Sequence, residues 1–102
     1  MKVEFSPSSV RDFETIGDWI ARDNPRRALS FVKELQNACM KLRRLPARYP
    51  LAEGFEDRGI RKKAHGNYLI FYRVIGNRVE VVHVLHGAID LEAMHFFIEG
   101  GT

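Results

Sequence analysis

The sequence predicts an α+β domain: an N-terminal strand and an antiparallel two-helix hairpin packed on an antiparallel sheet of about four strands, followed by a short C-terminal helix. Two runs dense in β-branched and aromatic residues, 68–75 and 78–86, flank a Gly-Asn pair, which is a strong hairpin signal. Upstream, apolar residues recur every three or four positions in two stretches, each preceded by a polar residue and a proline. A length of 102 residues suits one hydrophobic core, so we expect a single domain over residues 1–102.

The central hairpin implies a register. With Gly76-Asn77 as the turn, Arg73 faces Glu80 as an opposite-charge pair. One face carries Tyr68, Ile70, Tyr72, Val74, Val79, Val81, His83 and Leu85. The other carries Leu69, Phe71, Ile75, Val82 and Val84. Neither face is polar enough to lie open to water along its whole length, so we expect the helices to cover one face and something else to cover the other.

The N-terminal half supplies the helices. Residues 2–5 read as a short strand, which should join the sheet beside the last long strand. Ser6-Pro7 and Asn24-Pro25 each place a side-chain cap before a proline that costs nothing in the first helical turn. The link between the two helices is very short, so they should lie antiparallel.

The apolar stripes of these helices predict the core. Pro46 should end the second helix, whose buried side is marked by Ala28, Phe31, Val32, Leu35, Ala38, Cys39, Leu42 and Leu45. We expect a core of Val10, Phe13, Ile16, Ile20, Phe31, Leu35 and Leu42 against Leu69, Phe71, Val82 and Val84. Cys39 lies on the apolar stripe, so it should be an inert buried thiol.

A loop and a basic strand connect the helices to the hairpin. Residues 46–59 contain two prolines and two glycines and should form the loop. Ile60 to Ala64 reads as a strand that is basic along its length, and His65-Gly66-Asn67 would turn it into the hairpin. Beyond the hairpin, Leu91 to Ile98 has helical spacing.

Composition excludes several classes of protein. The single cysteine excludes a disulfide framework, and no apolar run approaches the roughly 20 residues of a spanning helix. The N-terminus has no basic-then-apolar signal pattern, so we expect a cytoplasmic protein. His83 and His86 are three apart on a strand and point to opposite faces, so we expect no metal site, and no pattern indicates a cofactor.

The best candidate for chemistry is the basic strand beside the tyrosine-bearing face. Arg61–Lys63 could hold a phosphate backbone while Tyr68 and Tyr72 stack on bases. The cations could also stabilise charge in an RNA-cleaving transition state, with His83 as acid or base. The alternative is that the tyrosines are ordinary sheet packing and the cations form a solvated edge that prevents strand addition.

A series of short motifs runs along nearly the whole chain. They are Phe5-Ser-Pro, the Asp23-Asn-Pro helix junction, Leu45-Pro with Tyr49-Pro, Gly59-Ile-Arg, Tyr68-Leu-Ile-Phe-Tyr-Arg-Val, and Val84-Leu-His-Gly-Ala with Asp90. In this order they resemble the RelE/ParE superfamily of bacterial toxins. The resemblance is closest to the ParE branch, in which the Arg-Leu-Pro, Tyr-Pro and Val-Leu-His-Gly signatures concentrate.

The resemblance implies the toxin of a type II toxin–antitoxin pair, which inhibits DNA gyrase by protein–protein contact and is neutralised by a cognate antitoxin. It favours a gyrase-poisoning protein without catalytic residues over an enzyme. The antitoxin would be of the ribbon-helix-helix type, with a disordered tail that folds on binding. Neither a membrane nor a small-molecule substrate is implied.

Departures from the family pattern keep two alternatives open. Positions that are usually arginine in the family hold His83 and Ile89, and no tyrosine follows His86. A RelE-like, ribosome-dependent mRNA endoribonuclease would use Lys62, Lys63, Arg73 and His83. The remaining alternative is an antitoxin-binding module with weak or lost toxicity.

An amphipathic antitoxin segment would explain why both faces of the hairpin are apolar. We expect it on the tyrosine-bearing face with the basic strand at its rim, in contact with Arg61, Lys62, Lys63, Tyr68, Ile70, Tyr72, Val81, His83 and Leu85. Apolar anchors would supply affinity, and the rim charges would mainly set association rate and salt dependence.

Overall fold

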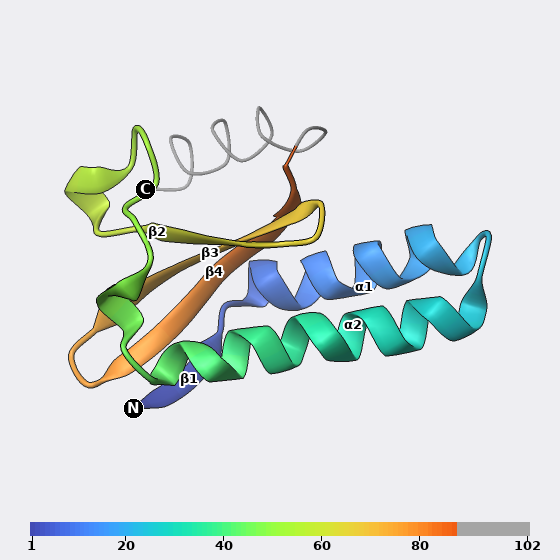
Figure 1. Ribbon diagram of the computed structural model, residues 1–102, viewed down its shortest axis with the longest axis horizontal. Coiled ribbons are helices and arrows are strands. Elements are labelled where there is room, and N and C mark those ends of the chain that lie inside the picture. Colours follow the sequence, from blue (N-terminus) through green and yellow to red (C-terminus); the bar gives the residue numbers. More distant parts are fainter. Residues whose placement is uncertain (88–102) are drawn as a thin grey trace.

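The computed structural model describes residues 1–87, in which two helices pack against a four-stranded sheet (Figure 1). The elements are β1 (Lys2–Phe5), α1 (Pro7–Ala21), α2 (Pro25–Met40), β2 (Arg61–His65), β3 (Tyr68–Ile75) and β4 (Arg78–His86). Three 3₁₀ turns, η1 (Lys41–Arg43), η2 (Pro46–Arg48) and η3 (Glu56–Arg58), lie between α2 and β2. The predicted α+β class is confirmed, whereas the helix expected over residues 91–98 lies outside the described residues.

The first strand lies beside the last, as predicted. The strand order is β1-β4-β3-β2, with β1 parallel to β4 and the other neighbours antiparallel. The sheet is therefore mixed rather than wholly antiparallel. A parallel pair needs a long crossover connection, and here the two helices are part of it. In Figure 1 the helical hairpin extends well beyond one end of the sheet.

The predicted hairpin register is confirmed near the turn. Ile75 pairs with Arg78, and Arg73 Nε lies 2.9 Å from Glu80 Oε1. Gly76 has a φ of 59°, in the left-handed region that favours glycine. The opposite charges of Arg73 and Glu80 in the sequence were therefore a correct indication of the register.

Further from the turn, β4 contains a β-bulge that the sequence analysis missed. Tyr72 pairs with Val81, but Phe71 pairs with His83, so Val82 is the extra residue. A bulge reverses the alternation of side chains beyond it. Assignments of β4 residues to faces by simple alternation therefore fail on the far side of Val82.

The helices cover the opposite face of β3 from the one predicted. The main core consists of Phe13, Ile16, Leu35, Ala38, Cys39, Leu42, Tyr68, Ile70, Tyr72, Val79, Val81 and Val84. A second cluster on the other face consists of Ala52, Phe55, Ile60 and Phe71, with Leu69 and Leu85 packed against it. The assignment of Leu69, Phe71 and Val82 to the helix-facing core is wrong. Both faces of β3 are apolar, so alternation could not distinguish them.

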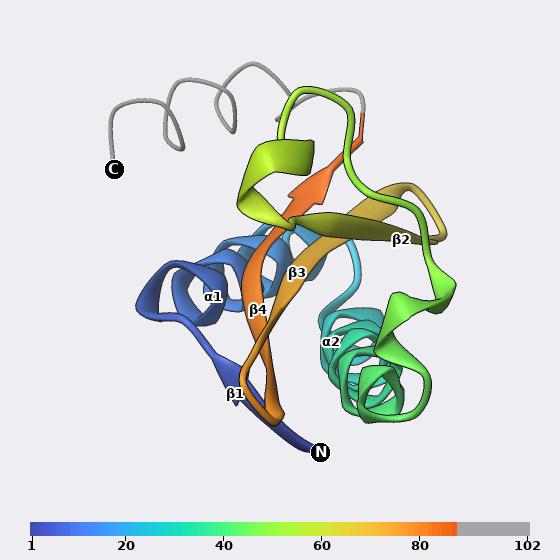
Figure 2. The ribbon, with the colours of Figure 1, turned by 90° about the vertical axis from the view of Figure 1, so that its left-hand side faces the viewer.

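The loop after α2 provides the cover for the second cluster. Figure 2 shows this segment running from the end of α2 past β2 to the side of the sheet away from the helices. Ala52 N–H donates to Ile60 O at 2.7 Å, which closes the loop on itself. A loop, rather than a second helical layer, therefore covers Phe71.

Two helical residues predicted to be buried are exposed. Val10 is 46% exposed and Leu45 is 73% exposed. The regular helix ends at Met40, and η1 carries Leu42 into the core. Leu45 precedes Pro46, which disfavours the α-helical conformation, and it adopts a left-handed φ of 51° that turns its side chain out of the stripe.

Candidate functional site

The two lysines predicted for RNA cleavage lie on opposite faces of the sheet. Across β2 and β3, Lys62 pairs with Phe71 and Lys63 pairs with Ile70. Lys62 lines a groove of about 340 Å³ beside Phe71. Lys63 Nζ instead lies 5.4 Å from the centroid of the Tyr49 ring. The two ammonium groups therefore face different surroundings.

The other two candidates are engaged in contacts that stabilise the fold. Arg73 is paired with Glu80 on the neighbouring strand. His83 is buried, and its Nδ1 lies 2.8 Å from Asp12 Oδ2 on α1. Lys62, Lys63, Arg73 and His83 therefore do not form one site in this structure.

Asp12 and Ser6 attach α1 to the bulge of β4. Asp12 Oδ2 accepts the backbone N–H of Val84 at 2.9 Å in addition to its contact with His83. Ser6 Oγ donates to Val82 O at 2.7 Å. These side chains bond backbone groups at and beside the bulge, where the strand ladder is disrupted. Asp12 could not be identified from the sequence, because a lone carboxylate beside an apolar stripe gives no sign of its distant partner.

The tyrosine-bearing face is not open to a partner. Ile70, Tyr72 and Val81 have 0% exposure, and Tyr68 has 9%. The expectation of an open surface here is wrong, because α1 and α2 pack on this face. Tyr72 Oη donates to Pro46 O at 2.5 Å, so its polar group is satisfied within the fold. Burial raises the pKa of the Tyr72 hydroxyl.

The expected rim residues are divided among several places. Arg61 Nη1 donates to Tyr49 O at 2.6 Å, so this cation holds the loop after α2. Leu85 packs against the second cluster. Residues predicted to form one binding surface therefore lie under the helices, in the second cluster and on both faces of the edge strand β2.

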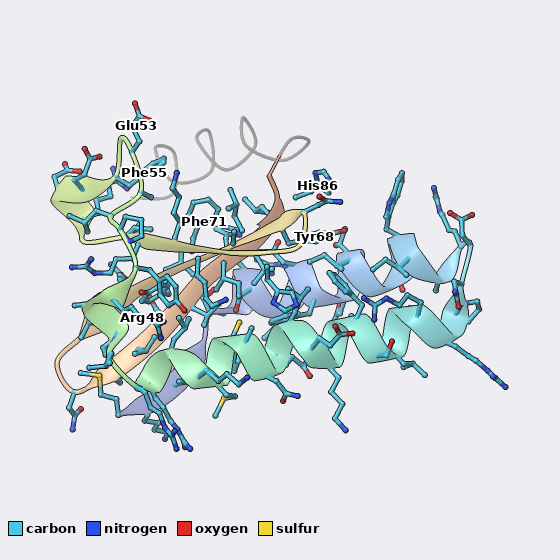
Figure 3. The ribbon with its side chains drawn as sticks, in the orientation of Figure 1. Arg48, Glu53, Phe55, Tyr68, Phe71 and His86 are labelled. Atoms are coloured by element: carbon cyan, nitrogen blue, oxygen red, sulfur yellow. The ribbon has the colours of Figure 1, made fainter. Side chains whose placement is uncertain are left out.

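The structure instead brings cations together at the end of α2. A pocket of about 500 Å³, here called the basic pocket, is lined by Met40, Lys41, Leu42, Arg43, Arg44, Leu45, Arg48, Tyr49 and Lys63. In Figure 3, Arg48 lies on the helix side of β2, whereas Glu53 and Phe55 lie on the other side. Four cations without an acid in residues 41–48 were the available sequence signal. The predicted site used the cations of Arg61–Lys63 instead.

A larger hollow lies between the helices. Its volume is about 910 Å³, and its apolar lining includes Ala21, Ala28, Leu29 and Val32. Leu29 is 80% exposed. We call this hollow the helix groove. Its lining also includes the charged side chains of Glu14, Asp18 and Lys33.

Other chemistry receives no support from the described part of the chain. Burial raises the pKa of Cys39 to about 12, which agrees with the prediction of an inert thiol. Within residues 1–87, no group of three or more His, Cys, Asp or Glu residues is placed to hold a metal ion. No helix in the same range is long and apolar enough to cross a membrane.

Comparisons with known proteins identify the family. The family described as ParE toxin of the type II toxin–antitoxin system parDE matches residues 3–91. No curated protein matches the sequence significantly. A chain of the chromosomal ParDE toxin–antitoxin system from P. aeruginosa is similar in fold, with a TM-score of 0.73 and 17% identity over 84% of this chain and 95% of that one.

A second solved structure shares the fold at a greater distance. A chain of the toxin–antitoxin complex RelBE2 from Mycobacterium tuberculosis has a TM-score of 0.57 and 24% identity, over 83% of this chain and 88% of that one. At these identities the two structures establish the fold alone, while the family match covers most of the sequence. The chain belongs to the ParE toxin family of type II toxin–antitoxin systems.

Proposed function

We propose that this ParE-type toxin inhibits DNA gyrase by protein–protein contact in the cytoplasm, without catalysis, until its antitoxin binds it. The observation that favours contact over RNA cleavage is the dispersal of the four ribonuclease candidates. Lys62 and Lys63 lie on opposite faces, and His83 is buried against Asp12. General acid–base chemistry needs its groups within hydrogen-bond reach of one substrate atom, which this arrangement does not offer.

The test measures the effect of the toxin on gyrase and on ribosome-bound mRNA in parallel. One purified preparation of the toxin is titrated into a gyrase supercoiling reaction with relaxed plasmid, and into a reaction with mRNA-loaded ribosomes. We expect loss of supercoiling and intact mRNA. Ribosome-dependent cleavage with unaffected supercoiling would replace this proposal with a ribonuclease. If neither reaction responds while antitoxin still binds, the chain is a binding module that has lost toxicity.

We further propose that an amphipathic helix of the antitoxin occupies the helix groove. The antitoxin's disordered tail would fold there and bury exposed apolar side chains such as Leu29. This surface replaces the tyrosine-bearing face expected from the sequence. The cognate antitoxin is proposed to be of the ribbon-helix-helix type.

A charge placed in the groove should disrupt this contact. Leu29 is 80% exposed, so Leu29→Asp should leave the fold intact while weakening antitoxin binding by at least about tenfold, as expected for an anchor residue. Leu45→Asp is the matched control, because Leu45 is 73% exposed and lies outside the groove. Titration calorimetry with the antitoxin measures both variants. Equal losses, or no loss from Leu29→Asp, would place the antitoxin elsewhere.

A further inference from the structure

We propose that the basic pocket binds the phosphodiester backbone of duplex DNA. The pocket lies where the end of α2, the turns η1 and η2, and strand β2 meet. Its cations are Lys41, Arg43, Arg44, Arg48 and Lys63. The choice of DNA rests on the proposed function, because a toxin bound to gyrase would work beside DNA.

The positive charge of the basic pocket is not neutralised by acidic side chains within residues 1–87. No acidic side chain lines the pocket, and within residues 1–87 none of the five cations forms an ion pair. The whole chain has a net charge of +3, so the sequence outside these five cations carries −2, the difference between +3 and +5. Positive charge is therefore concentrated at one site of a nearly neutral protein.

Helix electrostatics explain only part of this cluster. Lys41 and Arg43 follow the C-terminus of α2, where the helix dipole favours cations. Arg48 belongs to η2 and Lys63 to β2, so the dipole does not account for them. Like charges held close together repel one another, and a bound polyanion would remove that cost.

The loop that forms one wall of the pocket is fixed by hydrogen bonds from the sheet. Tyr72 Oη donates to Pro46 O, and Arg61 Nη1 donates to Tyr49 O. Leu45 adopts a left-handed φ of 51°, which is costly for a residue with a side chain and turns the chain into η2. The pocket is therefore organised before any ligand arrives.

The geometry favours a phosphate backbone over stacked bases. Arg48 Cζ and Lys63 Nζ lie over the half-buried Tyr49 ring, at 5.7 and 5.4 Å from its centroid, so cations occupy positions where a base would stack. Three of the five cations are arginines, whose planar fork matches phosphate oxygens.

The test measures DNA binding by the toxin alone, without gyrase. Fluorescence anisotropy with a labelled 20-base-pair duplex is recorded between 50 and 200 mM salt. The pocket variant carries Arg43→Gln, Arg44→Gln and Arg48→Gln, and all three side chains are exposed in the wild type. The matched control removes the same charge through Lys2→Gln, Arg11→Gln and Arg26→Gln, all exposed and outside the pocket. Circular dichroism and thermal unfolding verify that each variant is folded.

We expect the pocket variant to bind DNA at least about tenfold more weakly at 50 mM salt, with a slope of log K against log salt less steep by about 3. The control should keep most of both quantities. Equal losses in the two variants would overturn the proposal, because they would show attraction to overall charge. Pocket-dependent binding of a polyglutamate peptide without binding of duplex DNA would also overturn it, in favour of an acidic protein segment.

Failure of this inference and failure of the proposed function are distinguishable. DNA binding by the pocket in a toxin that does not inhibit supercoiling would overturn gyrase inhibition and support the pocket assignment. Inhibition of supercoiling without DNA binding by the toxin alone would overturn only the pocket assignment.

Discussion

The two faces of the sheet are closed in different ways. On the helix-facing side, α1 and α2 cover Ile70, Tyr72 and Val81 completely. On the other side, a loop brings Ala52, Phe55 and Ile60 against Phe71 and leaves a groove of about 340 Å³. The first face carries most of the core, and the second is a smaller cluster held by an irregular segment. Most of the stability therefore comes from the core under the helices.

A matched pair of isoleucines measures this difference directly. Ile70 is 0% exposed under the helices, and Ile60 is 4% exposed in the second cluster. We expect Ile70→Ala to lower the free energy of unfolding by about 4 kcal/mol and Ile60→Ala by about 2 kcal/mol, because a loop collapses onto a cavity more readily than a helical layer. Urea unfolding of both variants provides the comparison. Equal losses, or a larger loss for Ile60→Ala, would contradict the division between the faces.

Loss of the contacts that attach α1 to the bulge should have the next largest effect on stability. Asp12→Ala removes the acceptor for Val84 N–H and for His83, and should cost about 2 kcal/mol. His83→Ala should destabilise the protein less, since Asp12 keeps its bond to Val84, and should leave any growth inhibition largely intact. Thermal unfolding and a growth assay measure the two effects. Loss of mRNA cleavage in a folded His83→Ala protein would instead make His83 catalytic.

Alkaline pH should also act on the helix-covered face. Burial raises the pKa of Cys39 from 9.0 to about 12. The folded protein then holds the thiol proton more tightly than the unfolded chain, so stability should fall as pH rises from about 9 towards about 12. Tyr72, whose pKa is also raised, acts in the same direction above its unfolded value of about 10.

Replacing the thiol should reduce this pH dependence. Cys39→Ala should make the decline in unfolding free energy shallower, by at most about 1.4 kcal/mol per pH unit. The comparison uses slopes between pH 8 and 11 in urea, so the constant cost of the smaller side chain cancels. Identical slopes for the two proteins would show that the thiol is not shielded from water in the folded state.

Much of the fold could be predicted because its signals are local. Ser6 and Asn24 cap the two helices as expected, and Arg73 pairs with Glu80 in the expected register. The orientation of the sheet could not be predicted in the same way. Apolar residues occupy both faces of β3, and the Val82 bulge depends on contacts from Ser6 and Asp12, which lie about 70 or more residues away in sequence.

The site was harder to predict than the fold. Tyrosines on a strand beside a basic strand suggested an open surface. Tyr72 is instead buried, and its hydroxyl donates a hydrogen bond to Pro46 O. Alternation along β2 places Lys62 and Lys63 on opposite faces, and reading them as one basic run concealed this. Arg48 joins Lys63 only because Leu45 turns the chain, which no local pattern revealed.

The most direct test of the central claim removes ribonuclease candidates without disturbing the fold. Lys62 and Arg73 are only partly buried on strands β2 and β3, so the double variant Lys62→Gln, Arg73→Gln should remain folded. Its inhibition of gyrase supercoiling is titrated against that of the wild type. A contact-based toxin predicts half-inhibition concentrations that agree within about twofold, since the partly exposed Arg73–Glu80 ion pair contributes little to stability. The claim would be contradicted if the wild type cleaved mRNA on ribosomes, the variant did not, and neither protein inhibited supercoiling.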